Sequence, residues 1–236
     1  TLPAGAYVTL EHEYILILRN GPKRTFRPDE RPRRRASAFF WEERNAWFSD
    51  LWDFKGTRQQ LSATAARTRS GAFPFELAFR LINMYSLRGD TVLDPFVGTG
   101  TTTTAAIAAA RTSVGAEIDP HLAPTIDETI AAFAPGANAR QNQRYHDHIA
   151  WARTYQEHKG AAPGYENGPH HFPVMTRQET DLELLIAAEI ERTAPCEYRV
   201  RHQPFADPQS ADQAPRTIGM EPPADPSGQL SIFSGE

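Results

Sequence analysis

The clearest pattern of apolar and polar positions lies in the middle of the chain. Residues 75–86 carry apolar side chains at helical spacing, and residues 91–93 form a short apolar run after a turn. Small residues over 101–110 predict a second helix, and residues 113–118 predict a second strand. A strand, loop, helix and strand in this order form the βαβ unit of a parallel sheet. The pattern therefore predicts an α/β fold, a doubly wound and mainly parallel sheet with helices on both faces.

Weaker patterns flank this unit. Residues 14–18 are an apolar run rich in β-formers that stops at a turn, and they predict a buried strand. Residues 121–134 and 178–192 carry apolar side chains at helical spacing and predict two helices. Thr176 and Glu179 have the spacing of a capping box before the second of these.

Residues 204–236 contain six prolines and few apolar residues until the end. Such a composition cannot bury enough apolar surface to fold. We expect residues 205–236 to be a disordered tail, residues 72–204 to hold the βαβ unit and the helices after it, and residues 1–71 to be a separate region.

Charge changes this picture in the first region. Residues 1–90 hold 15 Lys and Arg against 10 Asp and Glu, whereas the chain as a whole has a net charge of -4. Eight of these basic residues lie within 19–35, opposed only by Asp29 and Glu30. Prolines interrupt this segment, so it predicts a basic loop that binds a local anionic partner. The aromatic residues that follow at 39–54 are interpreted as core and interface, in preference to base-stacking platforms.

Composition also limits the setting. The chain has one cysteine, Cys196, and no apolar run near 18 residues, which favours a reducing, cytoplasmic location without a membrane span. We expect Cys196 to be a small buried residue. The histidines at 146–171 are irregularly spaced, so no metal site is predicted. The chain begins with Thr1, which suggests that the start of the gene product is missing.

The loop between the two strands of the βαβ unit carries the chemistry. It reads Asp-Pro-Phe-Val-Gly-Thr-Gly over residues 94–100. Its two glycines allow close approach of a ligand, and the helix start offers free N–H groups. Asp94 at the first strand end can hold an ammonium group, and Glu117 after the second strand can accept the hydroxyls of a ribose.

Two common nucleotide motifs are excluded. The third glycine of the dehydrogenase fingerprint is absent, and no Gly-Lys-Ser/Thr of a phosphate-binding loop follows. A ligand with a ribose and an ammonium group but no phosphate fits best, and S-adenosylmethionine is such a ligand. The alternative is a tight strand-to-helix turn that binds nothing.

Residues 93–102 resemble the cofactor motif of the DNA amino-methyltransferases, which methylate N6 of adenine or N4 of cytosine. Phe73-Pro74 and the following helix resemble the segment that flanks the cofactor in that family, although Ser70-Gly71 replaces its usual His-Pro. His12-Glu13 before an apolar run and Gly115-Ala116-Glu117 are further similarities. The resemblance implies S-adenosylmethionine as cofactor. It implies these cofactor-binding residues: Phe73, Asp94, Pro95, Phe96, Gly98, Gly100, Thr101 and Glu117.

The chain departs from this family in one respect. The family's catalytic motif, Asp/Asn/Ser-Pro-Pro-aromatic, does not occur in the chain, since Glu221-Pro222-Pro223-Ala224 lacks the aromatic residue. The family has a permuted branch in which the catalytic motif precedes the cofactor motif. We therefore expect a circularly permuted enzyme that is truncated after its catalytic strand. The sequence then contains no identifiable catalytic residue, and we expect the chain alone to be inactive. The alternative is a non-catalytic DNA- or partner-binding subunit that keeps the cofactor-binding fold.

The resemblance also implies partners. Double-stranded DNA is the expected substrate, cytosine is favoured over adenine as the target base, and the first region would be the end of a catalytic and DNA-recognition region. The residues expected to contact DNA phosphates are Arg24, Arg27, Arg33, Arg34 and Arg35. Near the end, Gln229, Leu230, Ser231, Ile232 and Phe233 resemble the peptide by which bacterial DNA enzymes dock on the sliding clamp.

Overall fold

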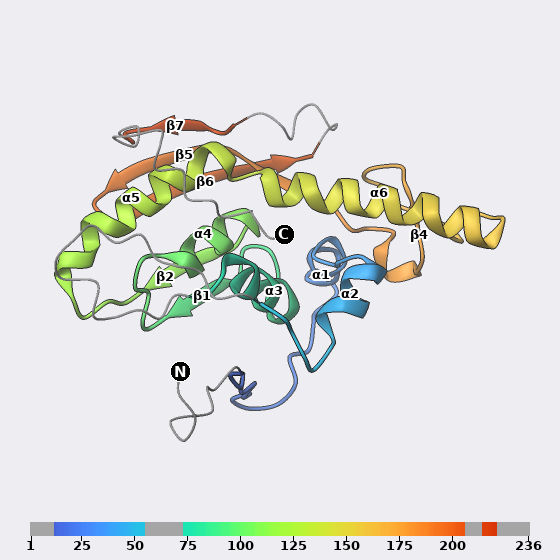
Figure 1. Cartoon of the computed structure of the whole chain (residues 1–236), viewed down its shortest axis with the longest axis horizontal. Coiled ribbons are helices and arrows are strands. Elements are labelled where there is room, and N and C mark those ends of the chain that lie inside the picture. Colours follow the sequence, from blue (N-terminus) through green and yellow to red (C-terminus); the bar gives the residue numbers. More distant parts are fainter. Residues whose placement is uncertain (1–11, 55–72, 206–213, 221–236) are drawn as a thin grey trace, which may run out of the picture.

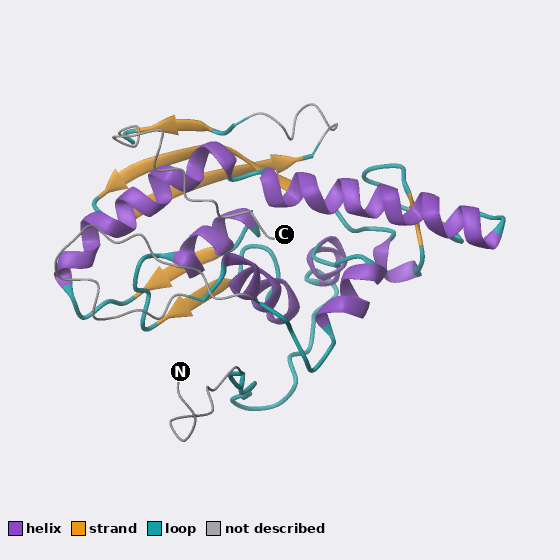
Figure 2. Cartoon of the chain, in the orientation of Figure 1, coloured by secondary structure: helices purple, strands orange, loops and turns teal. Residues whose placement is uncertain are grey.

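The structure is a computed structural model that describes residues 12–54, 73–205 and 214–220. Its helices and strands alternate over the middle of the chain and confirm the α/β class (Figures 1 and 2). The α-helices are α1 (Arg31–Ala36), α2 (Trp41–Trp47), α3 (Phe75–Tyr85), α4 (Thr101–Ala108), α5 (Ala123–Phe133) and α6 (Ala139–Lys159). Short 3₁₀ turns lie at Pro120–Leu122, Ala134–Gly136 and Arg177–Glu179.

The described strands form three small sheets. β1 (Thr91–Asp94) pairs in parallel with β2 (Thr112–Gly115), and α4 connects them as the predicted crossover. The strands outside this unit are β3 (Tyr165–Glu166), β4 (Pro173–Val174), β5 (Leu185–Ala194), β6 (Glu197–Pro204) and β7 (Arg216–Ile218). β3 and β4 pair antiparallel, whereas β5 lies between an antiparallel β6 and a parallel β7.

One main core joins these elements. α3, α4 and α5 pack their apolar faces together, and residues of β5 and β6 cover them from the other side. Trp47 of α2 is 2% exposed and belongs to the same core, while Phe40 is fully buried in a second cluster with Phe172. This confirms that aromatic residues of 39–54 are core, although Phe48 is 56% exposed.

The β1–β2 pair is covered on one face only by described residues. Val92 packs against the main core, but its neighbour Leu93 is 66% exposed. Leu93 lies opposite Val114 in the parallel register, and Val114 is 50% exposed. The expectation of a buried strand with helices on both faces is therefore met on the α4 side and not on the Leu93 side.

Two predicted elements are wrong. Residues 14–18 form no strand; Tyr14, Leu16 and Leu18 are at least 80% exposed, and the segment runs along the bottom of Figure 1, away from the labelled strands. Residues 178–192 form no helix, because the chain makes a 3₁₀ turn at 177–179 and then β5. The predicted capping box is present, but it caps this turn.

The error over β5 has a physical cause. A register shift between Ala187 and Glu189 inserts one extra residue in β5 against β6. Ile186, Ala187 and Ile190 are buried, and this spacing imitates one face of a helix. The buried side chain of Asn138 bonds both the N–H and the carbonyl of Ala187, which satisfies the backbone at the irregularity.

Three smaller differences complete the comparison with the sequence. The basic segment expected to be a loop contains α1, and α6 was not predicted. β7 lies in the segment expected to be disordered, so that prediction is wrong for residues 216–218. The connector at 55–72 and the clamp-like peptide at 229–233 lie outside the described residues.

Candidate cofactor-binding site

The loop between β1 and α4 is closed by its own hydrogen bonds. Asp94, the last residue of β1, accepts the N–H of Phe96 at 3.0 Å with one oxygen and the hydroxyl of Thr102 at 2.5 Å with the other. Thr102 lies in the first turn of α4, so this carboxylate ties the strand end to the helix start. Each oxygen of an ionised carboxylate has about two acceptor positions. Asp94 can therefore accept further hydrogen bonds from a ligand.

Two glycines shape the turn. Gly98 and Gly100 have φ angles of +55° and +93°, which favour glycine at both positions. A Cβ on Gly98 would meet only the carbonyl oxygen of Phe96, at 3.9 Å. The space in front of this loop is thus open to a ligand.

Glu117 joins the loop to the end of β2. Its Oε2 accepts the N–H of Gly98 at 3.0 Å, and its Oε1 accepts the N–H of Asp119 at 3.0 Å. The residue is only partly buried, and each oxygen keeps acceptor capacity. The structure therefore brings both acids, which lie 23 residues apart in the sequence, to the backbone of one loop.

The two predicted aromatic residues differ in their relation to the loop. Phe96 belongs to the loop and is 85% exposed, whereas Phe73 lies just before α3 and is 39% exposed. α3 packs against α4, but no hydrogen bond or ring contact joins Phe73 to the loop within the described residues. Pro95 is exposed, and Thr101 begins α4 with its carbonyl accepting the hydroxyl of Thr104.

Two residues of this site were missed in the sequence. Thr102 was seen only as part of a motif, although its hydroxyl fixes Asp94. Gly115 at the end of β2 faces Val97, because a Cβ there would lie 2.8 Å from Val97 Cγ2. A glycine directly before the Ala-Glu of the motif was a signal for such a close approach.

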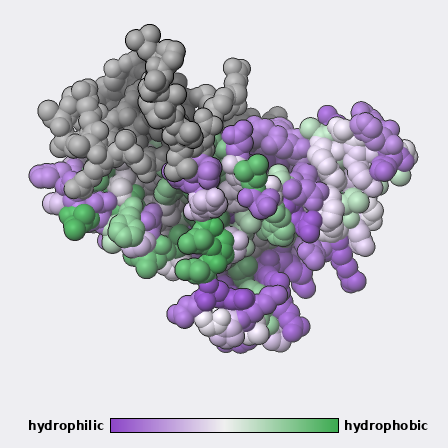
Figure 3. Space-filling view, turned by 60° about the horizontal axis from the view of Figure 1, so that its bottom comes forward, coloured by the Kyte–Doolittle hydropathy of each residue, from purple (hydrophilic) through white to green (hydrophobic). Residues whose placement is uncertain are grey.

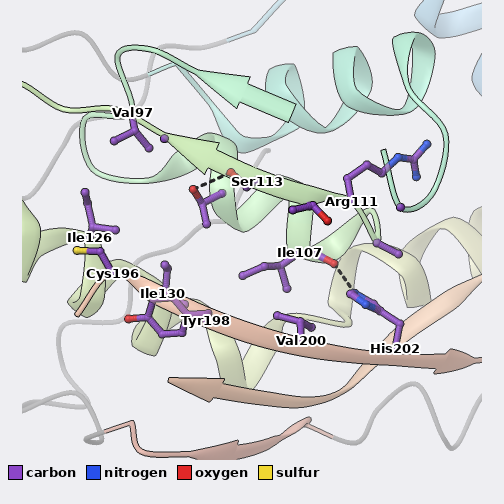
Figure 4. Close-up of a pocket in the computed structure, with 15 residues that line it drawn as sticks. Val97, Ile107, Arg111, Ser113, Ile126, Ile130, Cys196, Tyr198, Val200 and His202 are labelled. Carbon is purple, nitrogen blue, oxygen red and sulfur yellow. Dashed lines mark hydrogen bonds between the residues drawn. The ribbon is translucent and has the colours of Figure 1, made fainter. Parts of the chain in front are cut away.

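A cavity of about 340 Å³ lies beside the loop. It is lined by residues of α4, α5, β2 and β6 and by Val97 of the loop, and Figure 4 shows Tyr198 and Val200 of β6 pointing toward Ile107 and Ile130. Its lining includes none of the two acids and two aromatic residues of the predicted site. We therefore place the candidate site on the open loop, where the two acids lie, and not in this cavity.

The five arginines predicted to contact DNA are exposed, but four are in ion pairs. Arg24 and Arg33 pair with Asp90, Arg35 pairs with Asp181, and Arg27 pairs with the neighbouring acids of its own segment. Arg34 has no ion pair within the described residues and lies over the ring of Phe26 instead.

Three further observations concern the remaining predictions. Cys196 is exposed rather than buried, and its thiol bonds the carbonyl of Ala123. Among the described residues, no group of three or more His, Cys, Asp or Glu is arranged to hold a metal ion. No helix in the described part of the chain is long and apolar enough to cross a membrane.

Comparison with known proteins assigns the chain to a family. Residues 1–128, more than half of the chain, match the model of a DNA methylase family of the N6/N4 type. Over 185 residues the chain is 49% identical to the type II methyltransferase M.MthZI of Methanothermobacter thermautotrophicus, covering 78% of this chain and 50% of that protein. It is 54% identical over 129 residues to M.MjaI of Methanocaldococcus jannaschii, covering 55% of this chain and 42% of that protein. The chain thus spans about half the length of these curated relatives.

A solved structure also matches part of the chain. It is a putative DNA modification methylase of Thermus thermophilus in complex with S-adenosyl-L-methionine, 32% identical, with 52% of this chain and 49% of that chain covered and a TM-score of 0.37. The family match confirms the resemblance that residues 93–102 suggested, and with it S-adenosylmethionine as the cofactor of this kind of domain and the α/β methyltransferase fold. The chain belongs to the N6/N4 family of DNA methylases.

Proposed function

We propose that the chain is the cofactor-binding part of an enzyme that transfers a methyl group from S-adenosylmethionine to an exocyclic nitrogen of a DNA base. The observation that carries the proposal is the geometry around the loop of residues 94–100: Asp94 of the loop and Glu117 after β2 both accept backbone N–H groups of the loop, and both keep acceptor positions free. These two acids fit S-adenosylmethionine. The cofactor carries an ammonium group and a ribose, and Asp94 and Glu117 supply an acceptor for each.

Five residues in and around the loop have distinct parts in this proposal. Asp94 accepts the ammonium group, and Glu117 accepts the ribose hydroxyls. Thr102 holds the carboxylate of Asp94 in place. The exposed rings of Phe96 and Phe73 supply apolar walls that exclude water from the cofactor.

When bound, S-adenosylmethionine supplies an activated methyl group on a sulfonium. The chain's own residues bind and orient it, so that its contribution to the rate is positioning. A base inside the double helix is out of reach and has to leave the stack before its amine can react. Groups that hold the flipped base are not among the residues of this site.

Transfer in this proposal requires a second body that carries the Pro-Pro-aromatic motif. The chain lacks that motif, and two apolar patches on the described surface fit such a body. Leu93 and Val114 form one, and residues 14–18 form the other. Parallel sheets are normally covered on both faces, and no described residue covers the Leu93 side, so the second body is proposed to pack there. Figure 3 turns this lower side of the molecule forward and shows apolar groups among hydrophilic ones on the described surface.

The proposed experiment supplies the missing part. The chain is mixed with the half of M.MthZI that it does not match, and methyl transfer to unmethylated DNA is followed with labelled cofactor. We expect turnover by the mixture and none by either part alone. Analysis of the product then separates N4-methylcytosine, which we propose, from N6-methyladenine.

The outcomes separate the two candidate functions. Robust turnover by the chain alone would show that no second body is needed. Binding of DNA without any measurable binding of cofactor, alone or in the mixture, would favour the alternative of a non-catalytic DNA-binding subunit, which the missing motif supports. The clamp-like peptide at 229–233 stays a prediction; a labelled peptide of residues 222–236 that fails to bind a bacterial clamp would remove it.

A further inference from the structure

The basic segment, residues 19–35, is divided by its ion pairs into two sets of arginines. The first set is paired inside the molecule. Arg24 Nη1 lies 2.6 Å from Asp90 Oδ2, and Arg33 Nη2 lies 3.4 Å from Asp90 Oδ1. Asp90 directly precedes β1, so these pairs fix the segment to the strand that leads into the cofactor loop.

Two further arginines are also paired. Arg35 Nε lies 2.5 Å from Asp181, ahead of β5, whereas Arg27 lies within 3.4 Å of Asp29 and Glu30 of its own segment. A guanidinium that already faces a carboxylate gains little from a phosphate, because it has to give up its present partner first. Arg24, Arg33 and Arg35 therefore anchor the segment to the fold, and Arg27 is paired within it.

The second set consists of Arg31 and Arg34. They lie three residues apart on α1, so their side chains are neighbours on one helix face. Both are exposed, and neither has an ion pair with any residue in the described part of the chain. Arg34 lies over the ring of Phe26, 4.5 Å from its centroid, which holds the guanidinium while leaving its N–H edge free.

The guanidinium of Arg24 lies 4.9 Å from the centroid of the same ring, and it donates a hydrogen bond to Asp90. Phe26 thus links an anchored arginine to an unpaired one, and it keeps Arg34 at a defined place on the surface. Arg19 and Lys23 also lack ion pairs in the described residues, but they lie in irregular chain without such support.

We propose that Arg31 and Arg34 form a two-arginine site for the phosphodiester backbone of DNA, while Arg24, Arg33 and Arg35 position the segment. The proposal rests on the proposed function, in which DNA is the substrate. Of the five arginines that the sequence predicts to contact DNA phosphates, the proposal keeps only Arg34, and it adds Arg31. Guanidinium groups suit phosphate because they present several N–H donors in a fork.

The test measures DNA binding by the whole chain, without any methyl transfer. Fluorescence anisotropy with a duplex of arbitrary sequence gives the affinity as a function of salt. Replacing Arg31 and Arg34 with Ala is expected to lower the slope of log affinity against log salt by about 1.8, or about 0.9 for each phosphate that is no longer neutralised. Lysine at both positions should restore most of the slope, because it keeps the charge.

A matched control lies on β6. Arg199 and Arg201 are exposed and pair with Glu191 and Glu189, so their double replacement removes the same charge from another surface. We expect the slope to stay as in the unchanged chain. Equal losses in both doubles, or no DNA binding by the unchanged chain, would overturn the proposal. Neither result touches cofactor binding or transfer by the two-part mixture, which test the proposed function separately.

Discussion

The cofactor loop and the basic segment are both held by charged side chains, but the partners of these side chains lie at different distances along the sequence. In the loop, Asp94 bonds a residue 8 positions away and Glu117 bonds one 19 positions away. In the basic segment, Arg24 finds its carboxylate 66 positions away, at Asp90. The loop therefore carries its geometry in one short stretch of sequence, whereas the basic segment obtains its geometry from the rest of the fold.

The largest effect is expected from Asp94→Ala in the two-part mixture. The ammonium group would lose a charged acceptor, which costs about 1.5–3 kcal/mol and lowers cofactor affinity about 10- to 150-fold. Calorimetry measures the affinity directly. Thr102→Val is the matched control, since it removes one bond to Asp94 but keeps the carboxylate, and its loss should be clearly smaller. Unchanged affinity in Asp94→Ala would place the ammonium group elsewhere.

Gly115→Ala tests how tightly the loop is built. Its Cβ would lie 2.8 Å from Val97 Cγ2 and 2.9 Å from Val97 Cβ, so the neighbouring backbone has to move. Overpacking of this kind costs about 1–3 kcal/mol of unfolding free energy, measured by denaturant titration. Gly164→Ala is the control, because nothing lies within 4 Å of a Cβ there. Val97→Ala in the Gly115→Ala background should recover part of the loss, and full stability of Gly115→Ala alone would contradict the close approach.

The smallest effect concerns the anchor of the basic segment. Burial opposes ionisation of Asp90, but hydrogen bonds from Arg24 and from the N–H of Leu87, with the charges of Arg24 and Arg33, lower the pKa of this carboxyl group below its usual range. A carboxyl group whose pKa is lower in the folded state than in the unfolded state stabilises the fold at pH values above its unfolded-state pKa. This stabilisation is lost as the pH falls through the pKa of the folded state.

We therefore expect Asp90→Asn to destabilise the chain by about 1 kcal/mol at neutral pH. The difference from the unchanged chain should shrink as the pH falls below about 4, the ordinary range of an aspartate. Asp53→Asn, at an exposed acid without such partners in the described part of the chain, should show no comparable trend. A difference that stays constant with pH would mean that the Asp90 carboxylate does not hold the segment.

The contrast between local and distant partners also explains what the sequence could predict. The βαβ unit and the two acids were found because their periodicity and spacing are local. The anchoring of Arg24 was not, because no pattern near residue 24 points to residue 90. Residues 14–18 were expected to be buried from their apolar character alone, and burial depends on a neighbour that the described residues do not supply.

The extra residue in β5 has a consequence for reading relatives of this chain. Side chains of a regular strand alternate between its two faces. At Ala188 this alternation shifts by one position, because one residue between Ala187 and Glu189 has no counterpart in β6. A relative with a regular strand would be one residue shorter here and would still place its apolar residues inward. In an alignment of this family, a one-residue gap between positions 187 and 189 would mark a relative whose strand is regular. If such a relative were aligned without the gap, its buried positions would be matched to exposed positions of this chain.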